Sequence, residues 1–205
     1  MAEPTVHVVD DDESFLMAMA RLLRASGFPA RTYSSARAFL AECGADEPGC
    51  VVVDLRMPDL GGLELQSALA GSPHPLPVLF LTGHADTAST VQAMRGGAED
   101  FLEKTAAKEV LLAAVRRALG RNQQEREERS HREELRARFA AISAREREVL
   151  DHVLRGRLNK QIAGDLGIHE RTVKVHRKSI MTKLSVRSVA ALAQLSQEAG
   201  LIGNS

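Results

Sequence analysis

Short apolar runs alternate with amphipathic stretches through the first 120 residues of the chain. Runs rich in β-branched and aromatic side chains occur at residues 6–9, 30–33, 51–53, 78–81 and 101–102. Between these runs, apolar residues spaced by three and four predict helices at residues 14–25, 62–69, 88–95 and 110–119. Strands that alternate with helices favour right-handed βαβ connections and a buried parallel sheet. We therefore expect a doubly wound α/β domain with a five-stranded parallel sheet at residues 1–120.

The pattern changes beyond residue 120. Residues 121–138 are almost wholly polar, with acidic and basic side chains four residues apart, and this favours a charged helical linker. A flexible charged tether is the alternative. Helical apolar spacing returns at residues 142–154, 160–166, 171–184 and 189–195. Ser143 followed by Glu146 is a capping-box signature, so we expect a small all-α domain at residues 139–205.

Charge is distributed unevenly although the formal net charge is zero. Residues 1–120 carry 16 acidic and 10 basic side chains, whereas residues 139–205 carry 11 basic and 6 acidic ones. This asymmetry is expected when only the C-terminal part contacts nucleic acid. No apolar run approaches the length of about 18 residues needed to span a bilayer, and no signal peptide is visible, so we expect a cytoplasmic protein without membrane contact.

The chain contains two cysteines, Cys43 and Cys50, and they lack CxxC spacing. Such spacing is typical of zinc sites and redox pairs, so we expect neither. Two buried, reduced thiols in a reducing compartment are the prediction.

Reactive side chains follow the predicted strands. Asp10 and Asp11 come after the first strand, Asp54 after the third, Thr82 after the fourth and Lys104 after the fifth. Ligands bind at the carboxyl ends of strands in open parallel sheets, so we expect these residues to meet at one rim. Three neighbouring carboxylates favour a hard cation such as Mg²⁺, and a carboxylate beside Mg²⁺ can attack a phosphoryl group. Asp54 is the candidate nucleophile.

The basic tail contains a helix-turn-helix pattern around Gly167. In the second helix, the apolar stripe places a mostly cationic face opposite the core, which suits phosphates, guanine edges and a thymine methyl group. The face carries Arg171, Lys174, Val175 and Lys178, and Thr172 at the helix start can bind a phosphate. A merely solvated basic face is the alternative. Aromatic residues make up only 3% of the chain, which disfavours recognition of single strands by base stacking.

The first half of the chain resembles the receiver domain of two-component response regulators. The carrying segments are Val8 to Asp11, Asp54 to Asp59, Thr82-Gly83 and Phe101 to Lys104. The resemblance implies that Asp54 accepts phosphate from a sensor histidine kinase, that the Arg56 carbonyl binds Mg²⁺ beside Asp10 and Asp11, and that Thr82 and Phe101 are switch residues. Receivers usually have proline after the lysine, whereas this chain has Thr105, which leaves a receiver that does not respond to phosphate as an alternative.

The second half resembles the LuxR-type DNA-binding domain, so the whole chain is similar to the FixJ/NarL family. The carrying segments are Ser143 to Leu150, Asn159 to Ala163 and Thr172 to His176. Thr82 to His84 and the long polar linker favour the FixJ- and StyR-like branch. The resemblance implies base contacts from Lys174, Val175 and Lys178 and a phosphate contact from Lys160. His176 is expected either to pack inside the domain or to contact a phosphate.

These inferences combine into one hypothesis. Phosphorylation of Asp54 would alter the surface near Val91, Arg95 and Phe101, and receivers would pair there as a homodimer on double-stranded promoter DNA. RNA polymerase is a candidate further partner. Two rivals remain: an enzyme that hydrolyses phosphoesters at the acidic rim, and a constitutive DNA-binding or scaffold protein with a silent receiver.

Overall fold

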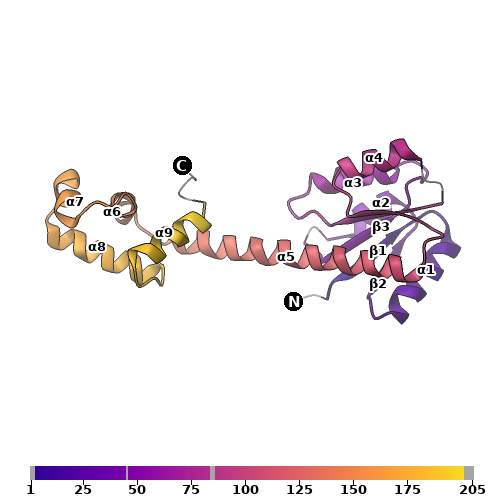
Figure 1. Cartoon of the computed structure of the whole chain (residues 1–205), viewed down its shortest axis with the longest axis horizontal. Helices are drawn as coiled ribbons and strands as arrows, with labels where there is room; N and C mark the ends of the chain where they lie inside the picture. Colours follow the sequence, from indigo (N-terminus) through magenta and orange to yellow (C-terminus); the bar gives the residue numbers. More distant parts are fainter. Residues whose placement is uncertain (1–2, 45, 84–85, 201–205) are drawn as a thin grey trace. The chain divides into compact units, whose positions relative to one another are not determined.

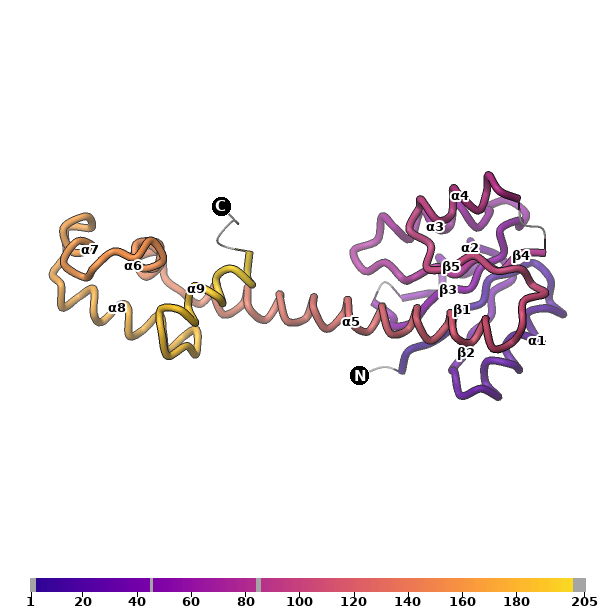
Figure 2. Tube along the Cα trace, viewed as in Figure 1, coloured from indigo at the N-terminus to yellow at the C-terminus, as the bar shows by residue number. Residues whose placement is uncertain are grey.

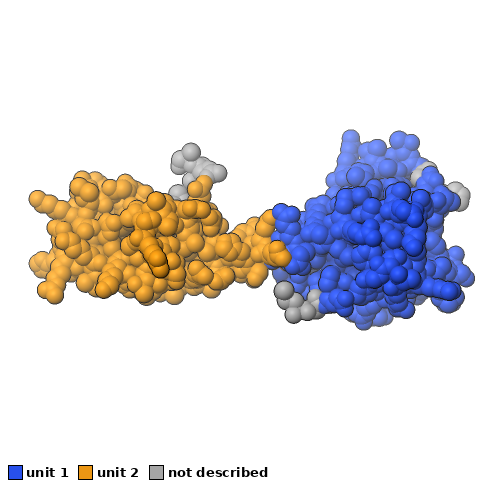
Figure 3. Space-filling view, turned by 60° about the horizontal axis from the view of Figure 1, so that its bottom comes forward, with its two compact units in different colours: residues 1–126 blue, residues 127–205 orange. Residues whose placement is uncertain are grey.

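The computed structural model describes residues 3–44, 46–83 and 86–200, so His84 lies outside the described residues. The chain divides into two compact units, residues 1–126 and residues 127–205 (Figure 3). Each unit has its own hydrophobic core, as the pattern of apolar residues predicts.

The first unit is built on one parallel sheet of five strands (Figure 1). The strands are β1 (Thr5–Val9), β2 (Ala30–Tyr33), β3 (Gly49–Val53), β4 (Val78–Thr82) and β5 (Asp100–Glu103), in the order β2-β1-β3-β4-β5. All four strand pairs are parallel, which confirms the predicted doubly wound topology. β1, β3 and β4 are buried along their whole length, because helices cover both faces of the sheet.

Two layers of helices cover the sheet (Figure 2). One layer consists of α1 (Glu13–Ala25) and the first part of α5 (Lys108–Ala140), which pack on Val6, Val8 and Val52. The other consists of α2 (Ala36–Glu42), α3 (Gly62–Ala70) and α4 (Thr87–Arg95), which pack around Phe39 and Phe80.

Helix α2 is absent from the elements that apolar spacing predicts. It has only seven residues, and two of them, Ala36 and Phe39, are buried. The sequence feature that marks the start of this helix is Ser35, an N-cap residue whose side chain accepts a hydrogen bond from the Ala38 N–H.

Residues 121–138 lie inside α5, so the flexible tether is wrong for this segment. One acidic and basic pair four residues apart, Glu134 with Arg138, is present at 2.6 Å. The beginning of the polar stretch contacts the first unit: the Gly49 N–H donates to Asn122 at 3.1 Å, and Arg126 pairs with Asp46 at 2.8 Å. Polar side chains of α5 therefore extend the first unit to residue 126.

The second unit packs four short helices against the end of α5. These are α6 (Ala144–Leu154), α7 (Asn159–Leu166), α8 (Glu170–Lys183) and α9 (Val189–Glu198). Leu135 and Phe139 of α5 belong to its core, although Leu135 lies in the stretch that the sequence marks as linker. The Ser143 and Glu146 capping box is confirmed, with both hydrogen bonds present. Gly167 adopts φ 63°, a left-handed conformation that suits glycine, at the turn between α7 and α8.

Both cysteines are free thiols, as predicted. Cys50 is buried in the sheet, and burial raises the pKa of its thiol to about 12. The expectation of two buried thiols is wrong for Cys43, which is only partly buried at the end of α2. Within the described residues, no helix has the length and apolar character that crossing a bilayer requires.

Candidate functional site

The predicted rim residues meet at the carboxyl ends of the strands. Asp10 follows β1, Asp54 follows β3, Thr82 ends β4 and Lys104 follows β5. The sheet ladder continues through them, because the Asp54 N–H donates to the Val9 carbonyl and the Lys104 N–H donates to the Thr82 carbonyl. Asp10, Asp54 and Thr82 are buried, with exposed fractions of 1%, 9% and 2%. The parallel register therefore brings side chains from four strands into one acidic site.

Lys104 is the cation of this site. Its Nζ lies 2.6 Å from Asp10 Oδ2 and 3.3 Å from Asp54 Oδ2. It also lies 4.3 Å from the centroid of the Phe15 ring. Burial opposes the charged ammonium, but the two carboxylates outweigh burial and raise the pKa of Lys104 above its ordinary value. Lys104 is thus a charged group already directed at Asp54.

The carboxylates of Asp10, Asp11 and Asp54 form a set of hard oxygen donors. One oxygen from each lies within 4.8 Å of the others, and Asp11 is exposed. Burial raises the pKa of Asp10, although Lys104 and the Asp12 N–H oppose that shift. Asp54 Oδ1 is buried and has no hydrogen-bond partner among the described residues. A divalent cation with oxygen preference would satisfy that atom and neutralise the cluster, so the residues fit Mg²⁺.

The other predicted receiver residues surround this rim. Phe101, half-buried on β5, stacks on Phe80 with ring centroids 5.7 Å apart. The Arg56 side chain points to Asp86, the N-cap of α4, at 3.6 Å. The Lys104–Thr105 peptide is trans, because the described residues contain no cis peptide bond. Val91, 44% exposed, and Arg95 lie on the solvent side of α4.

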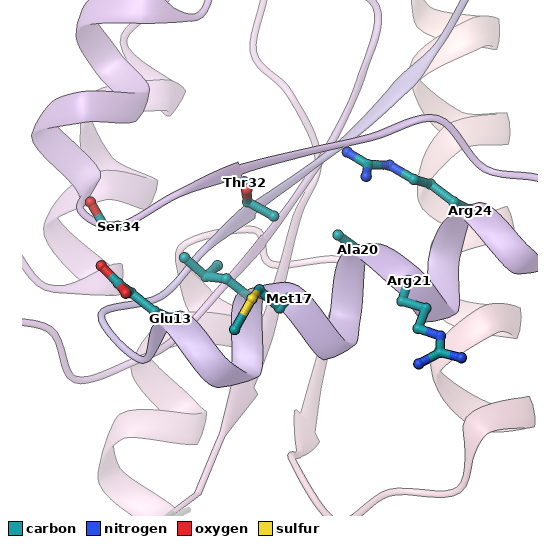
Figure 4. Close-up of a pocket in the computed structure, with 8 residues that line it drawn as sticks. Glu13, Met17, Ala20, Arg21, Arg24, Thr32 and Ser34 are labelled. Carbon is teal, nitrogen blue, oxygen red and sulfur yellow. The ribbon is translucent and has the colours of Figure 1, made fainter.

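A separate hollow of about 670 Å³ lies between α1 and β2 (Figure 4). Figure 4 shows Glu13 and Met17 from α1 facing Thr32 of β2 and Ser34 beyond it. The lining residues include neither Asp54 nor Lys104, so this hollow does not belong to the acidic rim.

Most of the predicted DNA-binding residues are exposed on the helix-turn-helix, and two are partly buried. Val173, Ile180 and Leu184 are buried in the core, as the apolar stripe predicts. On the opposite side, Val175 is 59% exposed. Also exposed are Lys160 at the start of α7 and Arg171, Lys174 and Lys178 on α8. Lys174 forms an exposed pair with Glu170 at 3.2 Å.

Two neighbours of this face are less exposed than the cations. Thr172, in the first turn of α8, and His176 are partly buried. Partial burial is compatible with either role predicted for His176, packing or phosphate contact. Lys174, Val175 and Lys178 are thus exposed on α8, and His176 is partly buried beside them.

Sequence patterns miss the contacts of two side chains, Glu146 and Arg177, that hold this surface. Glu146, recognised only as part of a capping box, also accepts hydrogen bonds from Ser179 and Lys183 of α8, at 2.6 and 2.7 Å. Arg177 of α8 donates to Asn159 of α7 at 2.8 Å. These contacts fix the orientation of α8, and no local spacing indicates them because their partners lie 18 to 37 residues apart.

Comparisons with known proteins cover both units. Residues 6–116 match the response regulator receiver domain, and residues 140–196 match the bacterial regulatory proteins of the luxR family. The chain is 42% identical to the response regulator protein TmoT of Ectopseudomonas mendocina, over 95% of this chain and 89% of that protein. It is 41% identical to the transcriptional regulatory protein FixJ of Azorhizobium caulinodans, over 96% of this chain and 93% of FixJ.

Solved structures agree with these relatives. The structure of the response regulator StyR has 44% identity and a TM-score of 0.89, covering 96% of this chain and all of that one. Full-length FixJ from B. japonicum has 34% identity and a TM-score of 0.59, covering 99% of this chain and all of that one. The chain is a transcriptional regulator and not an enzyme, and it belongs to the two-component response regulators that join a receiver domain to a LuxR-type DNA-binding domain.

Proposed function

We propose that Asp54 is the phosphoacceptor of this response regulator and that a phosphohistidine of its sensor kinase is the donor. The observation that carries the proposal is the position of Lys104, whose ammonium lies 3.3 Å from Asp54 Oδ2 while Asp54 Oδ1 has no hydrogen-bond partner among the described residues. Lys104 thereby holds the carboxylate in place, and its two oxygens can divide the roles of binding Mg²⁺ and attacking phosphorus.

The transfer exchanges one bond for another. A carboxylate oxygen of Asp54 bonds to phosphorus, the bond from phosphorus to the imidazole nitrogen of the donor breaks, and the electron pair stays with the imidazole. Lys104 then pairs with a phosphoryl oxygen, and the buried Thr82 hydroxyl donates to another. Such a transfer depends mainly on positioning and charge neutralisation, which this rim provides.

Mg²⁺ is the cation that we assign to the site. Asp10, Asp11 and Asp54 supply the carboxylate oxygens, and the Arg56 backbone carbonyl supplies a further ligand. When bound, Mg²⁺ neutralises the negative charge that would otherwise repel the phosphoryl group. Lys104 alone cannot balance three carboxylates, which supports the need for this ion.

Activation would act through pairing of receivers. We assign the dimer surface to the face of α4 and β5 that includes Val91, Arg95 and Phe101. Met94, 47% exposed, adds apolar area beside Val91. An inward shift of Phe101, following Thr82 toward the phosphoryl group, would change this face. A dimer holds two DNA-binding domains over adjacent half-sites and raises affinity through effective concentration.

In promoter recognition, we assign base contacts to Lys174, Val175 and Lys178 in the major groove. Arg171, Thr172 and Lys160 would contact phosphates, and His176 either packs or joins them. Functionally, the chain then consists of a receiver at residues 1–120, a helical linker at residues 121–138 and a DNA-binding domain at residues 139–205. RNA polymerase is the partner that such a promoter complex would meet next.

Acetyl phosphate with Mg²⁺ provides the test. We expect the intact mass to rise by one phosphoryl group in the wild type and to stay unchanged in Asp54→Asn. Asp59→Asn is the matched control, because Asp59 is nearby, exposed and at φ 67°, which asparagine tolerates. Equal labelling of Asp54→Asn and wild type would refute the assignment.

Sedimentation and DNA binding then test the coupling. Phosphorylated wild type should sediment as a dimer and bind promoter DNA more tightly, whereas Asp54→Asn should do neither. Phosphoryl labelling that leaves both the sedimenting mass and the DNA affinity unchanged would support a silent receiver instead.

A further inference from the structure

A second cluster of metal-binding side chains lies under α2, away from the acidic rim. His7 comes from the middle of β1, Cys43 from the end of α2 and Glu47 from the segment before β3. One ligand atom from each residue lies within 4.8 Å of the others. Imidazole, thiol and carboxylate are the three side chains that most often bind zinc.

His7 is the unusual member of this cluster. Its side chain is fully buried, and its Nδ1 lies 3.1 Å from the hydroxyl of Tyr33. Its Nε2 is also buried but has no hydrogen-bond partner among the described residues. A buried polar atom without a partner costs about 1–3 kcal/mol, so it requires an explanation. Burial lowers the pKa of His7, which favours the neutral imidazole, the form that binds metal ions.

We propose that His7, Cys43 and Glu47 form a binding site for Zn²⁺, with water as the fourth ligand, although the spacing of the cysteines predicts no zinc site. On binding, the Cys43 thiol would release its proton to solvent, and the resulting thiolate and the Glu47 carboxylate would balance the two charges of the ion. With Nδ1–H donating to the Tyr33 hydroxyl, Nε2 would carry the lone pair for the ion, and this outer hydrogen bond would fix the ring orientation. The proposal is independent of the phosphoacceptor assignment, since the two sites share no residue.

The surroundings allow an ion to enter and remain. Cys43 and Glu47 are only partly buried, whereas His7 packs against the rings of Tyr33 and Phe39. The ligand atoms of a tetrahedral zinc site lie about 3.3–3.8 Å apart, closer than the limit of 4.8 Å within which these atoms lie here. Binding would therefore move the partly buried Cys43 and Glu47 side chains toward the imidazole of His7. Arg31 Nη1 donates to both Glu47 oxygens, at 3.1 Å to Oε1 and 3.4 Å to Oε2, so the longer contact would give way when Oε2 binds the ion.

Zinc would join two parts of the chain that are distant in sequence, β1 and the stretch between α2 and β3. It would connect β1, the end of α2 and the segment that leads into β3. That segment also carries Asp46, which pairs with Arg126 of α5 at 2.8 Å. We therefore expect zinc to raise the thermal stability of the first unit by mass action.

Cobalt provides a spectroscopic probe of this site. Full-length protein without a polyhistidine tag is stripped with a chelator, kept reduced with a phosphine, and titrated with Co²⁺. Thiolate coordination produces a ligand-to-metal absorption band in the near ultraviolet, which the all-oxygen rim at Asp54 cannot produce. A competition titration, in which Zn²⁺ displaces Co²⁺ and the band disappears, then gives the affinity for Zn²⁺.

We expect the band to saturate at about one Co²⁺ per chain, as one tetrahedral site requires. The band should be absent in Cys43→Ser, and in Glu47→Gln the affinity should fall about tenfold or more. Cys50→Val and Asp54→Asn are the controls, because each removes a potential ligand elsewhere and should keep the band. Circular dichroism verifies that each variant is folded. No band in folded, reduced wild type, an equal band in Cys43→Ser, or unchanged affinity in Glu47→Gln would overturn the proposal.

Discussion

Glu146 links the start of α6 to α8, and its replacement tests how the DNA-binding surface is held. Glu146 Oε2 accepts hydrogen bonds from the Ser143 N–H at 2.8 Å and from Lys183 at 2.7 Å, and Oε1 accepts one from Ser179 at 2.6 Å. The residue is only 5% exposed. The charged carboxylate is therefore more favourable in the folded unit than in the unfolded chain.

The magnitude follows from the pKa of Glu146, which the hydrogen bond from Lys183 and the other donors lower from 4.5 to about 2. At about 1.4 kcal/mol per pH unit, this difference corresponds to roughly 3 kcal/mol before screening. The Lys183 side chain is 37% exposed. Solvent therefore reduces the loss of unfolding free energy expected for Glu146→Gln to about 1–2 kcal/mol. Glu146→Ala also removes the capping acceptor, which adds about 1 kcal/mol.

The sign of the pH dependence is also defined. The folded pKa of Glu146 lies below the unfolded value, so its stabilisation is complete above about pH 4.5 and is lost as the pH falls toward about 2. The free-energy difference between wild type and Glu146→Gln should therefore narrow as the pH falls from about 5 to about 3.

Hydrogen exchange detected by mass spectrometry on peptides from α6 and α8 measures this free energy in the full-length protein. Glu148→Gln is the matched control, because Glu148 is on the same helix but forms an exposed pair with Arg145, worth less than about 0.5 kcal/mol. Equal protection of these peptides from exchange in Glu146→Gln and in Glu148→Gln would contradict the stabilising role of Glu146. A free-energy difference between wild type and Glu146→Gln that stays constant with pH would contradict it as well.

Further predictions concern dimerisation, DNA binding and the hydrophobic core of the second unit. Val91→Glu should abolish the phosphorylation-dependent dimer in sedimentation without reducing phosphate labelling; a dimer of unchanged affinity would exclude this face. Lys178→Ala should relax sequence preference by about 1–3 kcal/mol in a salt-titrated promoter assay, whereas Lys160→Ala should weaken all sequences alike and reduce the salt slope by about one; identical profiles would contradict these roles. Leu135 is 1% exposed, so Leu135→Ala should lower the unfolding free energy of the second unit by about 2–5 kcal/mol, as measured by hydrogen exchange. An unchanged free energy would contradict the place of Leu135 in that core.

Local pattern was sufficient for much of the fold. The five strands and most helices follow from periodicity, since burial of one face imposes a regular spacing of apolar residues. Helix α2 is not predicted by periodicity, because its seven residues include only two buried ones and cannot show a helical repeat of apolar positions. Asp10, Asp54, Thr82 and Lys104 were found because parallel strands must end at the same edge of a sheet.

The sequence by itself determined which residues could form the acidic rim and which face of α8 is cationic, because both follow from the geometry of a single element or of neighbouring strands. Only the tertiary structure decided that Glu146 reaches α8, and that His7, Cys43 and Glu47 converge beneath α2. These contacts join residues from separate elements with no fixed spacing. Their positions depend on how whole helices pack, a property that periodicity along the chain does not record.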